Sequence, residues 1–270
     1  MLIYAAFLGG VGLIVGSFLG LVSLRLPRGE DVVFGRSRCG GCGRTLKPWR
    51  MIPLLSWVLS RGRCSECGSK IPLRYPLIEL GSGLIGVWAG LHSADITMAL
   101  MTGVLGWNLL IIALIDAEHF WLPDQLTLPQ FVSGLIAALL LYPGGLGAAF
   151  PSALIPPLIG ALVGFGGLWL LARLYRVVRG REGLGGGDPF LLGASGAWVG
   201  WTGLPSVLLW ASVAGLSVVL AMLIVRRRVS ATDRLPFGVF LSIGVWLTWL
   251  YGPLGLRWAT AAISAAGRPR

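Results

Sequence analysis

The chain has 270 residues, of which 55% are hydrophobic and 12% are charged, and its mean hydropathy is +0.79. Because a soluble domain carries about 25% charged residues, this composition excludes an ordinary water-soluble globule and predicts a membrane protein. The net charge of +11 does not indicate a nucleic-acid partner, because the basic residues gather in alternate loops without interleaved stacking aromatic residues.

Residues 2–24 form the first expected membrane span. The segment lacks a basic region ahead of its apolar stretch and a small-residue cleavage site, so we expect it to be retained rather than removed as a signal peptide. Runs of ~20 apolar residues predict further spans at 76–93, 96–115, 126–143, 152–172, 189–203, 204–225 and 236–254. The predicted fold class is an all-α polytopic transmembrane helical bundle of about eight spans with a small cytoplasmic insert.

The basic residues predict the orientation of these spans. Segment 25–74 holds 11 of the 22 Lys and Arg residues, and short clusters at 173–181 and 226–234 hold eight more. The intervening loops, expected outside, hold none, which is the positive-inside pattern. Arg226, Arg227 and Arg228 are interpreted as topology anchors. Three arginines after the last span would lie outside, so a seven-span alternative stays open.

We therefore expect four regions: a first span (1–25), a cytoplasmic insert (26–75), a transmembrane core (76–256) and a short tail (257–270). The insert holds all four cysteines, as the pairs Cys39/Cys42 and Cys64/Cys67, each followed by glycine and separated by 21 residues. This spacing is typical of tetrahedral zinc. Two disulfides are the alternative, which the reducing cytoplasm disfavours. Four thiolates leave no open position for water, so the zinc is expected to be structural.

Two acidic residues lie at the ends of apolar segments, where carboxylates are costly and usually functional. Asp116 closes the third expected span, and Asp188 opens the sixth, so both arrive at the cytoplasmic face. Two carboxylates that share one proton can hydrolyse an amide. Each has a structural alternative: Asp188 precedes Pro189 as a helix cap would, and Asp116 could simply mark the membrane boundary.

Two other acidic residues next to or within apolar segments are Asp124 and Glu79. Asp124, on the same face, is expected to cap the fourth span. Glu79, within the second span, is either a polar contact in the bundle or a binding group. No cysteine or serine nucleophile with a histidine base is recognisable, since the only histidines are His92 and His119. An acid–acid mechanism is the most economical hydrolytic hypothesis.

The motifs of the chain resemble those of the type IV prepilin peptidases, bifunctional leader peptidase/N-methyltransferases of the GxGD class of intramembrane aspartic proteases. The similarity covers nearly the whole chain. The matching motifs, besides both cysteine pairs, are Gly16-Ser17-Phe18-Leu19, Arg25-Leu26-Pro27, Ile52-Pro53-Leu54-Leu55-Ser56-Trp57, Arg74-Tyr75-Pro76-Leu77-Ile78-Glu79-Leu80, Ile115-Asp116, Leu122-Pro123-Asp124, Glu182-Gly183, Gly185-Gly186-Gly187-Asp188 and Pro236-Phe237-Gly238.

The resemblance implies that Asp116 and Asp188 are the catalytic pair, and that Gly185 and Gly187 form the supporting loop before Asp188. It implies cleavage of type IV prepilin-like and type II secretion pseudopilin precursors after a glycine, at the cytoplasmic side of the bacterial inner membrane. It also implies methylation of the new N-terminus from S-adenosylmethionine, with Glu79 as a candidate for binding the methyl donor.

Three positions depart from the family pattern. Gly20 stands where asparagine is usual, Met51 precedes Ile-Pro in place of asparagine, and Pro189-Phe190 replaces a run that often carries lysine. The first two concern the region that the family associates with methyl transfer, whereas the peptidase motifs match.

Helix dipoles suggest where the shared proton resides. Asp188 begins a helix, where the dipole favours the charged form, and Asp116 ends one, so Asp116 is predicted to hold the proton. The competing classes are a proton- or cation-coupled transporter and a non-catalytic scaffold that docks through its insert. Asparagine at either position separates the three, because only a peptidase would lose precursor cleavage.

Overall fold

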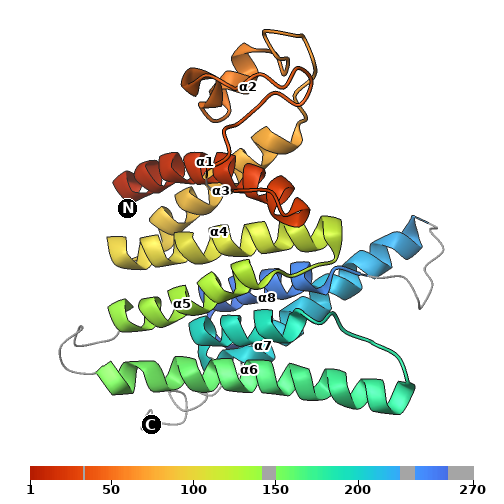
Figure 1. The fold of residues 1–270 in the computed structure, drawn as a ribbon. Coiled ribbons are helices and arrows are strands. Elements are labelled where there is room, and N and C mark those ends of the chain that lie inside the picture. Colours follow the sequence, from red (N-terminus) through yellow and green to blue (C-terminus); the bar gives the residue numbers. More distant parts are fainter. Residues whose placement is uncertain (33, 142–149, 226–234, 255–270) are drawn as a thin grey trace. The chain divides into compact units, whose positions relative to one another are not determined.

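The computed structural model describes residues 1–32, 34–141, 150–225 and 235–254. Within these ranges the regular elements are helices, with two isolated β-bridges, so the predicted all-α fold class is confirmed (Figure 1). The elements are α1 (Leu2–Arg25), η1 (Leu26–Arg28), η2 (Pro48–Met51), α2 (Leu55–Leu59), α3 (Arg74–His92), α4 (Ile96–His119), α5 (Asp124–Leu141), α6 (Phe150–Arg179), α7 (Asp188–Ile224) and α8 (Phe237–Tyr251). The basic cluster at 226–234 and the expected tail, 257–270, lie outside the described residues.

Five of the described helices are long and apolar enough to cross a membrane: α1 extended by η1, α4, α5, α6 and α7. Helix α8 is apolar but has only 15 residues. Helix α7 has 37 residues and covers two of the expected spans, with a break at Gly200, where φ is 67° and ψ is 172°. Only glycine adopts such a backbone without strain. Each expected span overlaps a helix, but the number of about eight crossings stays a prediction.

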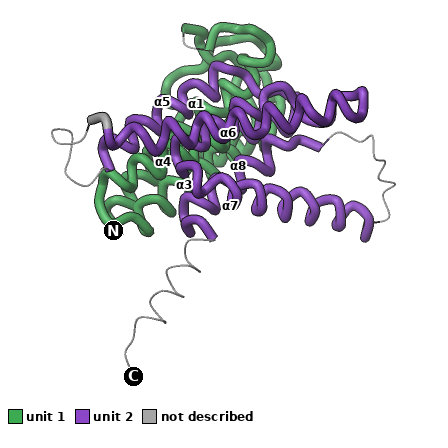
Figure 2. Tube along the Cα trace, turned by 90° about the horizontal axis from the view of Figure 1, so that it is seen from below, with its two compact units in different colours: residues 1–111 green, residues 112–270 purple. Residues whose placement is uncertain are grey.

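The chain divides into two compact units, residues 1–111 and 112–270, with the boundary inside α4 (Figure 2). In the first unit, α1 and α3 pack together through small residues. At Gly16, a Cβ atom would lie 2.6 Å from the Cα atom of Glu79, closer than real side chains allow. The pairing is antiparallel and brings Gly20 beside Tyr75 near the end of α1 and Gly90 beside its first turn. Such close approach is the usual basis of helix association in membranes.

In the second unit, α7 packs against α5, α6 and α8. At Gly164 of α6, a Cβ atom would lie 2.6 Å from the carbonyl oxygen of Leu192, so only glycine permits this contact. The buried Gln130 of α5 donates from Nε2 to the Ser195 hydroxyl of α7 at 3.0 Å. These contacts hold the first half of α7, which begins with Asp188.

Candidate functional site

Asp116 lies in the last turn of α4 and is only 5% exposed. Its Oδ2 atom accepts the backbone N–H of Val239, at 3.0 Å, from a position 123 residues further along the chain. Val239 belongs to the first turn of α8, where backbone N–H groups have no partner within the helix. The Asp116 carboxyl group therefore supplies an acceptor to the start of α8 and does more than mark a membrane boundary.

Gly238 makes this approach possible. A Cβ atom at this position would lie 2.9 Å from Oδ2 of Asp116 and 2.9 Å from Cδ2 of Leu122. Any larger residue would push α8 away from both side chains. The glycine therefore sets how closely α8 approaches the carboxyl group.

Asp188 is the first residue of α7 and is 2% exposed. Its Oδ2 atom accepts the backbone N–H of Gly185 at 2.8 Å. Gly187, and not Asp188, is the N-cap residue of the helix. The carboxyl group thus organises the glycine loop before α7, and the alternative of Asp188 as the N-cap is not supported.

Leu122 lies between the two acidic segments. It is 8% exposed, and its Cδ2 atom faces Gly238, beside Asp116. Its Cβ atom lies 2.5 Å from where a Cβ atom of Gly187 would be, immediately before Asp188. The two carboxyl groups are near enough for the charge on Asp116 to act on Asp188. Two acids 72 residues apart in sequence (116 to 188) thus belong to one buried site.

The other candidate acids have different surroundings. Asp124 is exposed in the first turn of α5. In the first unit, Glu79 is buried on α3 and its Oε2 atom accepts the backbone N–H of Leu54 at 2.8 Å. Leu54 has a φ of 57°, which is unusual for a branched residue. Glu79 therefore makes a polar contact that holds the strained start of α2 against α3.

The two cysteine pairs form matching turns in the insert. In the first turn, Cys39 N–H donates to the Arg44 carbonyl at 2.9 Å, and Gly43 N–H donates to the Cys39 carbonyl at 2.9 Å. The second turn repeats both bonds, each at 2.8 Å, between the equivalent residues. The closing glycines have φ values of 69° and 70°, which explains why glycine follows each pair. Ser69 occupies the position equivalent to Arg44.

The geometry of the sulfur atoms fits a metal ion. All four cysteines are free, and their Sγ atoms lie within 4.8 Å of one another. The Sγ atoms of Cys39 and Cys67 are 3.8 Å apart, and a tetrahedral site with metal–sulfur bonds of ~2.3 Å requires about that separation. The four cysteines could therefore hold one metal ion.

Ser69 connects the two turns at the sulfur atoms. Its hydroxyl oxygen lies 3.5 Å from Sγ of Cys39 and 3.1 Å from Sγ of Cys67. The Ser69 hydroxyl, followed by the backbone amides of Cys42 and Gly41, lowers the pKa of the Cys39 thiol to about 5. Because thiolates are the form that binds metal, these donors favour the metal-binding form of Cys39.

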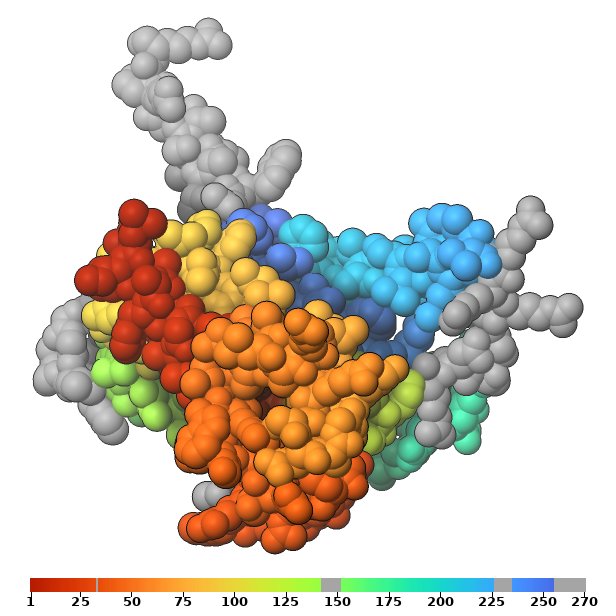
Figure 3. All heavy atoms as spheres, turned by 90° about the horizontal axis from the view of Figure 1, so that it is seen from above, coloured from red at the N-terminus to blue at the C-terminus, as the bar shows by residue number. Residues whose placement is uncertain are grey.

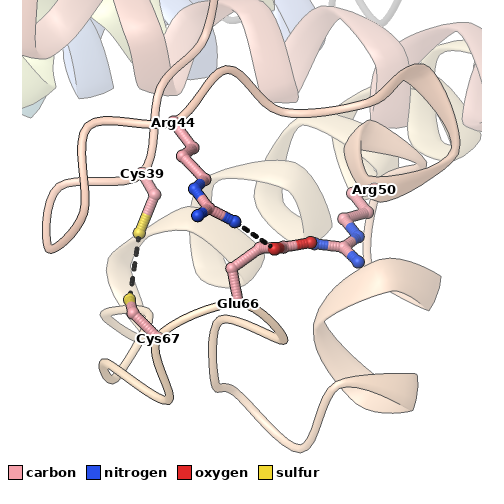
Figure 4. Close-up of polar contacts among 5 residues, drawn as sticks. All are labelled: Cys39, Arg44, Arg50, Glu66 and Cys67. Atoms are coloured by element: carbon pink, nitrogen blue, oxygen red, sulfur yellow. Dashed lines mark hydrogen bonds and ion pairs between the residues drawn. The ribbon is translucent and has the colours of Figure 1, made fainter.

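Glu66 makes a second connection between the turns (Figure 4). It lies inside the second cysteine pair and accepts from Nη1 of Arg44 at 2.7 Å and from Nη1 of Arg50 at 3.2 Å. The hydrogen bond from Arg44 and the charge of Arg50 lower the pKa of Glu66. The carboxylate thereby joins the first turn, the second turn and η2.

Comparison with known proteins gives the family. Residues 11–93 match the model of the bacterial peptidase A24 N-terminal domain, and residues 103–220 match that of the type IV leader peptidase family. The chain belongs to the type IV leader peptidase family. In this family member, the N-terminal match includes both cysteine pairs and Glu79, and the leader peptidase match includes Asp116 and Asp188.

Similar proteins span nearly the whole length of this family member. Proteins named prepilin leader peptidase/N-methyltransferase from Stutzerimonas stutzeri and Pseudomonas aeruginosa are each 37% identical over 265 residues, which cover 90% of this chain and 89% and 88% of theirs. One from Burkholderia pseudomallei is 38% identical over 272 residues, which cover 92% of this chain and 85% of its own. No solved structure gives a significant match.

Several residues of the site did not stand out in the sequence. Leu122 and Gly238 lie in motifs that resemble the family, but their contacts with the acidic segments depend on the packing of α8. Ser69 and Glu66 are common polar residues of an exposed insert, and only the folded turns bring them to sulfur and arginine. For Ser69, one signal was available in the sequence: Arg44 and Ser69 each lie five residues after the first cysteine of their pair.

Proposed function

We propose that this protein is a membrane aspartic endopeptidase that removes the leader peptide of type IV prepilin-like and pseudopilin precursors. The observation that supports this most directly is the buried site in which Leu122 lies between the segments of Asp116 and Asp188, near enough for the charge on Asp116 to act on Asp188. Proteins of the same family carry the name prepilin leader peptidase. Asp116 and Asp188 are assigned as the catalytic pair, with Gly185 and Gly187 supporting the second aspartate.

The proposed reaction divides the work between the two acids. One carboxylate removes a proton from a water molecule, whose oxygen attacks the scissile carbonyl carbon, while the protonated partner donates a hydrogen bond to the carbonyl oxygen. When the tetrahedral intermediate collapses, the C–N bond breaks, and the leaving nitrogen takes up the proton that the first carboxylate removed from water. The backbone N–H groups of Val239 and Gly185 keep each carboxyl group oriented.

Methylation of the new N-terminus is proposed as the second activity, with S-adenosylmethionine as methyl donor. The relatives bear the name N-methyltransferase as well. Glu79 remains the candidate for the donor site, although its Oε2 atom already accepts the Leu54 N–H. The donor would have to bind beside that contact or displace it.

The metal of the four-cysteine cluster is proposed to be structural zinc. Four thiolates satisfy a tetrahedral divalent ion and leave no position for water. The complex would keep two negative charges. The cations Arg44, Lys47 and Arg50 line a cavity of about 370 Å³ together with three of the cysteines, and they offset that charge. Zinc would hold together an insert whose regular elements are very short.

The helices make the protein a membrane protein, and we place it in the bacterial inner membrane with the insert (26–75) in the cytoplasm. The region 76–256 is proposed to form the peptidase core. The partner is then a precursor whose own N-terminal transmembrane helix docks laterally from the bilayer, so that its leader reaches the aspartates. Nucleic acid has no part in this proposal.

The experiment uses purified full-length protein, a prepilin substrate and labelled S-adenosylmethionine, with cleavage and methyl incorporation scored separately. Asp116→Asn and Asp188→Asn should each lower cleavage at least ~100-fold, the range expected for loss of acid–base catalysis. Asp124→Asn is the matched control, since that carboxylate is exposed. Normal cleavage by either variant of the pair would contradict the assignment.

A further inference from the structure

The surface of the insert around α2 carries an unusual combination of apolar and basic side chains. Leu55, Val58 and Leu59 lie on one face of α2 at helical spacing and are 51–75% exposed. Trp57 of the same helix lines a groove of about 360 Å³ together with Ile71, Leu73 and three cations, Arg61, Arg63 and Lys70. Figure 3 shows the outer surface of this insert in orange. An exposed apolar face rimmed by positive charge is typical of an interfacial membrane contact.

The three cations of the groove are not neutralised by the insert itself. None has an ion-pair partner among the described residues. The acids of the insert make other contacts: Glu66 pairs with Arg44 and Arg50, Glu30 lies 3.9 Å from Arg28, and Asp31 accepts the Phe34 N–H at 3.1 Å. The groove therefore offers its positive charge to an external anion.

The chain places this surface at the membrane boundary. Leu73 directly precedes α3, and Lys70 lies four residues before it. Tyr75 of α3 lies beside Gly20 of α1, a helix long and apolar enough to cross the bilayer. Arg74 donates to the hydroxyl of Ser23 at 2.8 Å, near the end of α1. A segment of four residues spans at most ~14 Å, so Lys70 lies within that distance of the end of the apolar helix pair.

A second contact holds α2 near the start of α3. Leu54, its N-cap residue, donates its N–H to Glu79, which lies more than one turn inside α3. Leu54 and Arg61, which bracket α2, both have positive φ values, 57° and 53°. Such strain in non-glycine residues persists only where surrounding contacts impose it and is frequent at functional sites. The strain and the Glu79 contact hold the apolar face of α2 in a defined orientation.

We infer that α2 and its groove dock on the bilayer of the same membrane and bind anionic phospholipid headgroups. The face formed by Leu55, Val58 and Leu59 enters the boundary between headgroups and acyl chains. Three cations, Arg61, Arg63 and Lys70, bind the phosphate groups of the lipids. Anionic lipids give the cytoplasmic leaflet a negative surface potential. The inference rests on the cytoplasmic placement of the insert proposed above. A precursor with a basic leader would not suit this groove, because such a leader carries the same sign of charge.

Hydrogen exchange of the full-length protein in lipid nanodiscs tests the inference without any substrate. We expect amides of residues 55–63 and 70–73 to exchange at least ~5-fold more slowly in nanodiscs that contain phosphatidylglycerol than in pure phosphatidylcholine, since a single basic residue near an anionic surface contributes ~5-fold. Equal exchange in the two lipid compositions would overturn the inference, and this comparison needs no variant.

Variants then show which side chains make the contact with lipid. Arg61→Gln/Arg63→Gln/Lys70→Gln should abolish the lipid-dependent difference, whereas the matched triple variant Arg28→Gln/Arg36→Gln/Arg38→Gln, with the same loss of charge on the same insert, should retain it. Retention by the first variant would contradict the assignment. Leu55→Ser/Val58→Ser/Leu59→Ser should raise exchange in both lipids. Bound metal, measured in each variant, reports whether the cysteine turns are folded.

Two further experiments test whether phosphate or the precursor binds this groove in place of lipid. Inorganic phosphate added to phosphatidylcholine nanodiscs should give no protection, and protection by phosphate alone would identify a small-anion site instead. A prepilin substrate should not replace the lipid effect, and protection that requires the substrate in either lipid would assign the surface to the precursor. Cleavage of the precursor is measured separately in detergent. If lipid does not protect this surface, the proposed peptidase activity is therefore neither supported nor contradicted.

Discussion

The carboxyl group of Asp116 accepts the backbone N–H of Val239 at 3.0 Å, across 123 residues of sequence. This single bond attaches the end of α4 to the start of α8. It also changes the expectation for the shared proton. Asp116 lies in the last turn of α4, which favours the protonated form, but it also faces the N-terminus of α8, whose dipole favours the charged form. The two helix ends act in opposite directions on Asp116, so the helix dipoles alone do not assign the proton, and its place on Asp116 stays a prediction.

The close approach at Gly238 should be essential for the arrangement of the acids. In Gly238→Ala, the new Cβ atom would meet both Asp116 and Leu122 and displace the N-terminus of α8. Displacement of a catalytic group by ~1 Å can cost ~100-fold in rate, so we expect cleavage to fall by one to two orders of magnitude. Gly166→Ala is the control, because nothing lies within 4 Å of a Cβ atom there. Unchanged cleavage in Gly238→Ala would show that α8 does not position Asp116.

Leu122 should act as a positioning residue for both acidic segments. We expect Leu122→Ala to lower kcat for cleavage with little change in KM, because the substitution leaves a gap between Gly187 and Gly238. Leu122→Met nearly conserves the volume and should retain most activity. The measurement is steady-state cleavage of a prepilin substrate across pH. A change confined to KM, or equal losses in both variants, would exclude this role.

Ser69 should tighten metal binding through the two sulfur atoms it contacts. Loss of a hydrogen bond to a metal ligand typically weakens metal binding ~10–100-fold, and we expect this for Ser69→Ala in competition with a chromophoric chelator. Ser69→Thr keeps the hydroxyl group and should restore affinity. Ser65→Ala, an exposed serine of the same turn, should bind as tightly as the native protein. If Ser65→Ala and Ser69→Ala lose affinity equally, the hydroxyl contact is not responsible.

Glu79 should hold the start of α2. In Glu79→Ala, Leu54 loses the acceptor of its N–H, and its strained backbone is expected to relax. We expect faster amide exchange across residues 54–60, while cleavage by the aspartate pair persists. Methyl incorporation, measured in the same sample, decides whether Glu79 also serves the second activity. Unchanged exchange across α2 would show that the Glu79 contact does not restrain it.

The sequence alone determined the class of this protein and its chemically important residue types. Long apolar runs can only be satisfied as helices in lipid, a rule that local composition reveals. Two Cys-x-x-Cys-Gly motifs separated by 21 residues predict a metal site, because each motif brings two thiolates together at a spacing typical of tetrahedral zinc. Asp116 and Asp188 stood out because carboxylates at the ends of apolar segments are rare.

Only the tertiary structure decided how these residues meet. Hydropathy does not report which helix end faces which carboxyl group, so the hydrogen bond from Val239 to Asp116 could not be anticipated. The packing of Leu122 between Gly187 and Gly238 could not be anticipated either. The merging of two expected spans into α7, broken at Gly200, likewise depends on packing. Contacts between distant segments arise from shape and close approach, and these properties belong to the folded chain and not to any local stretch of it.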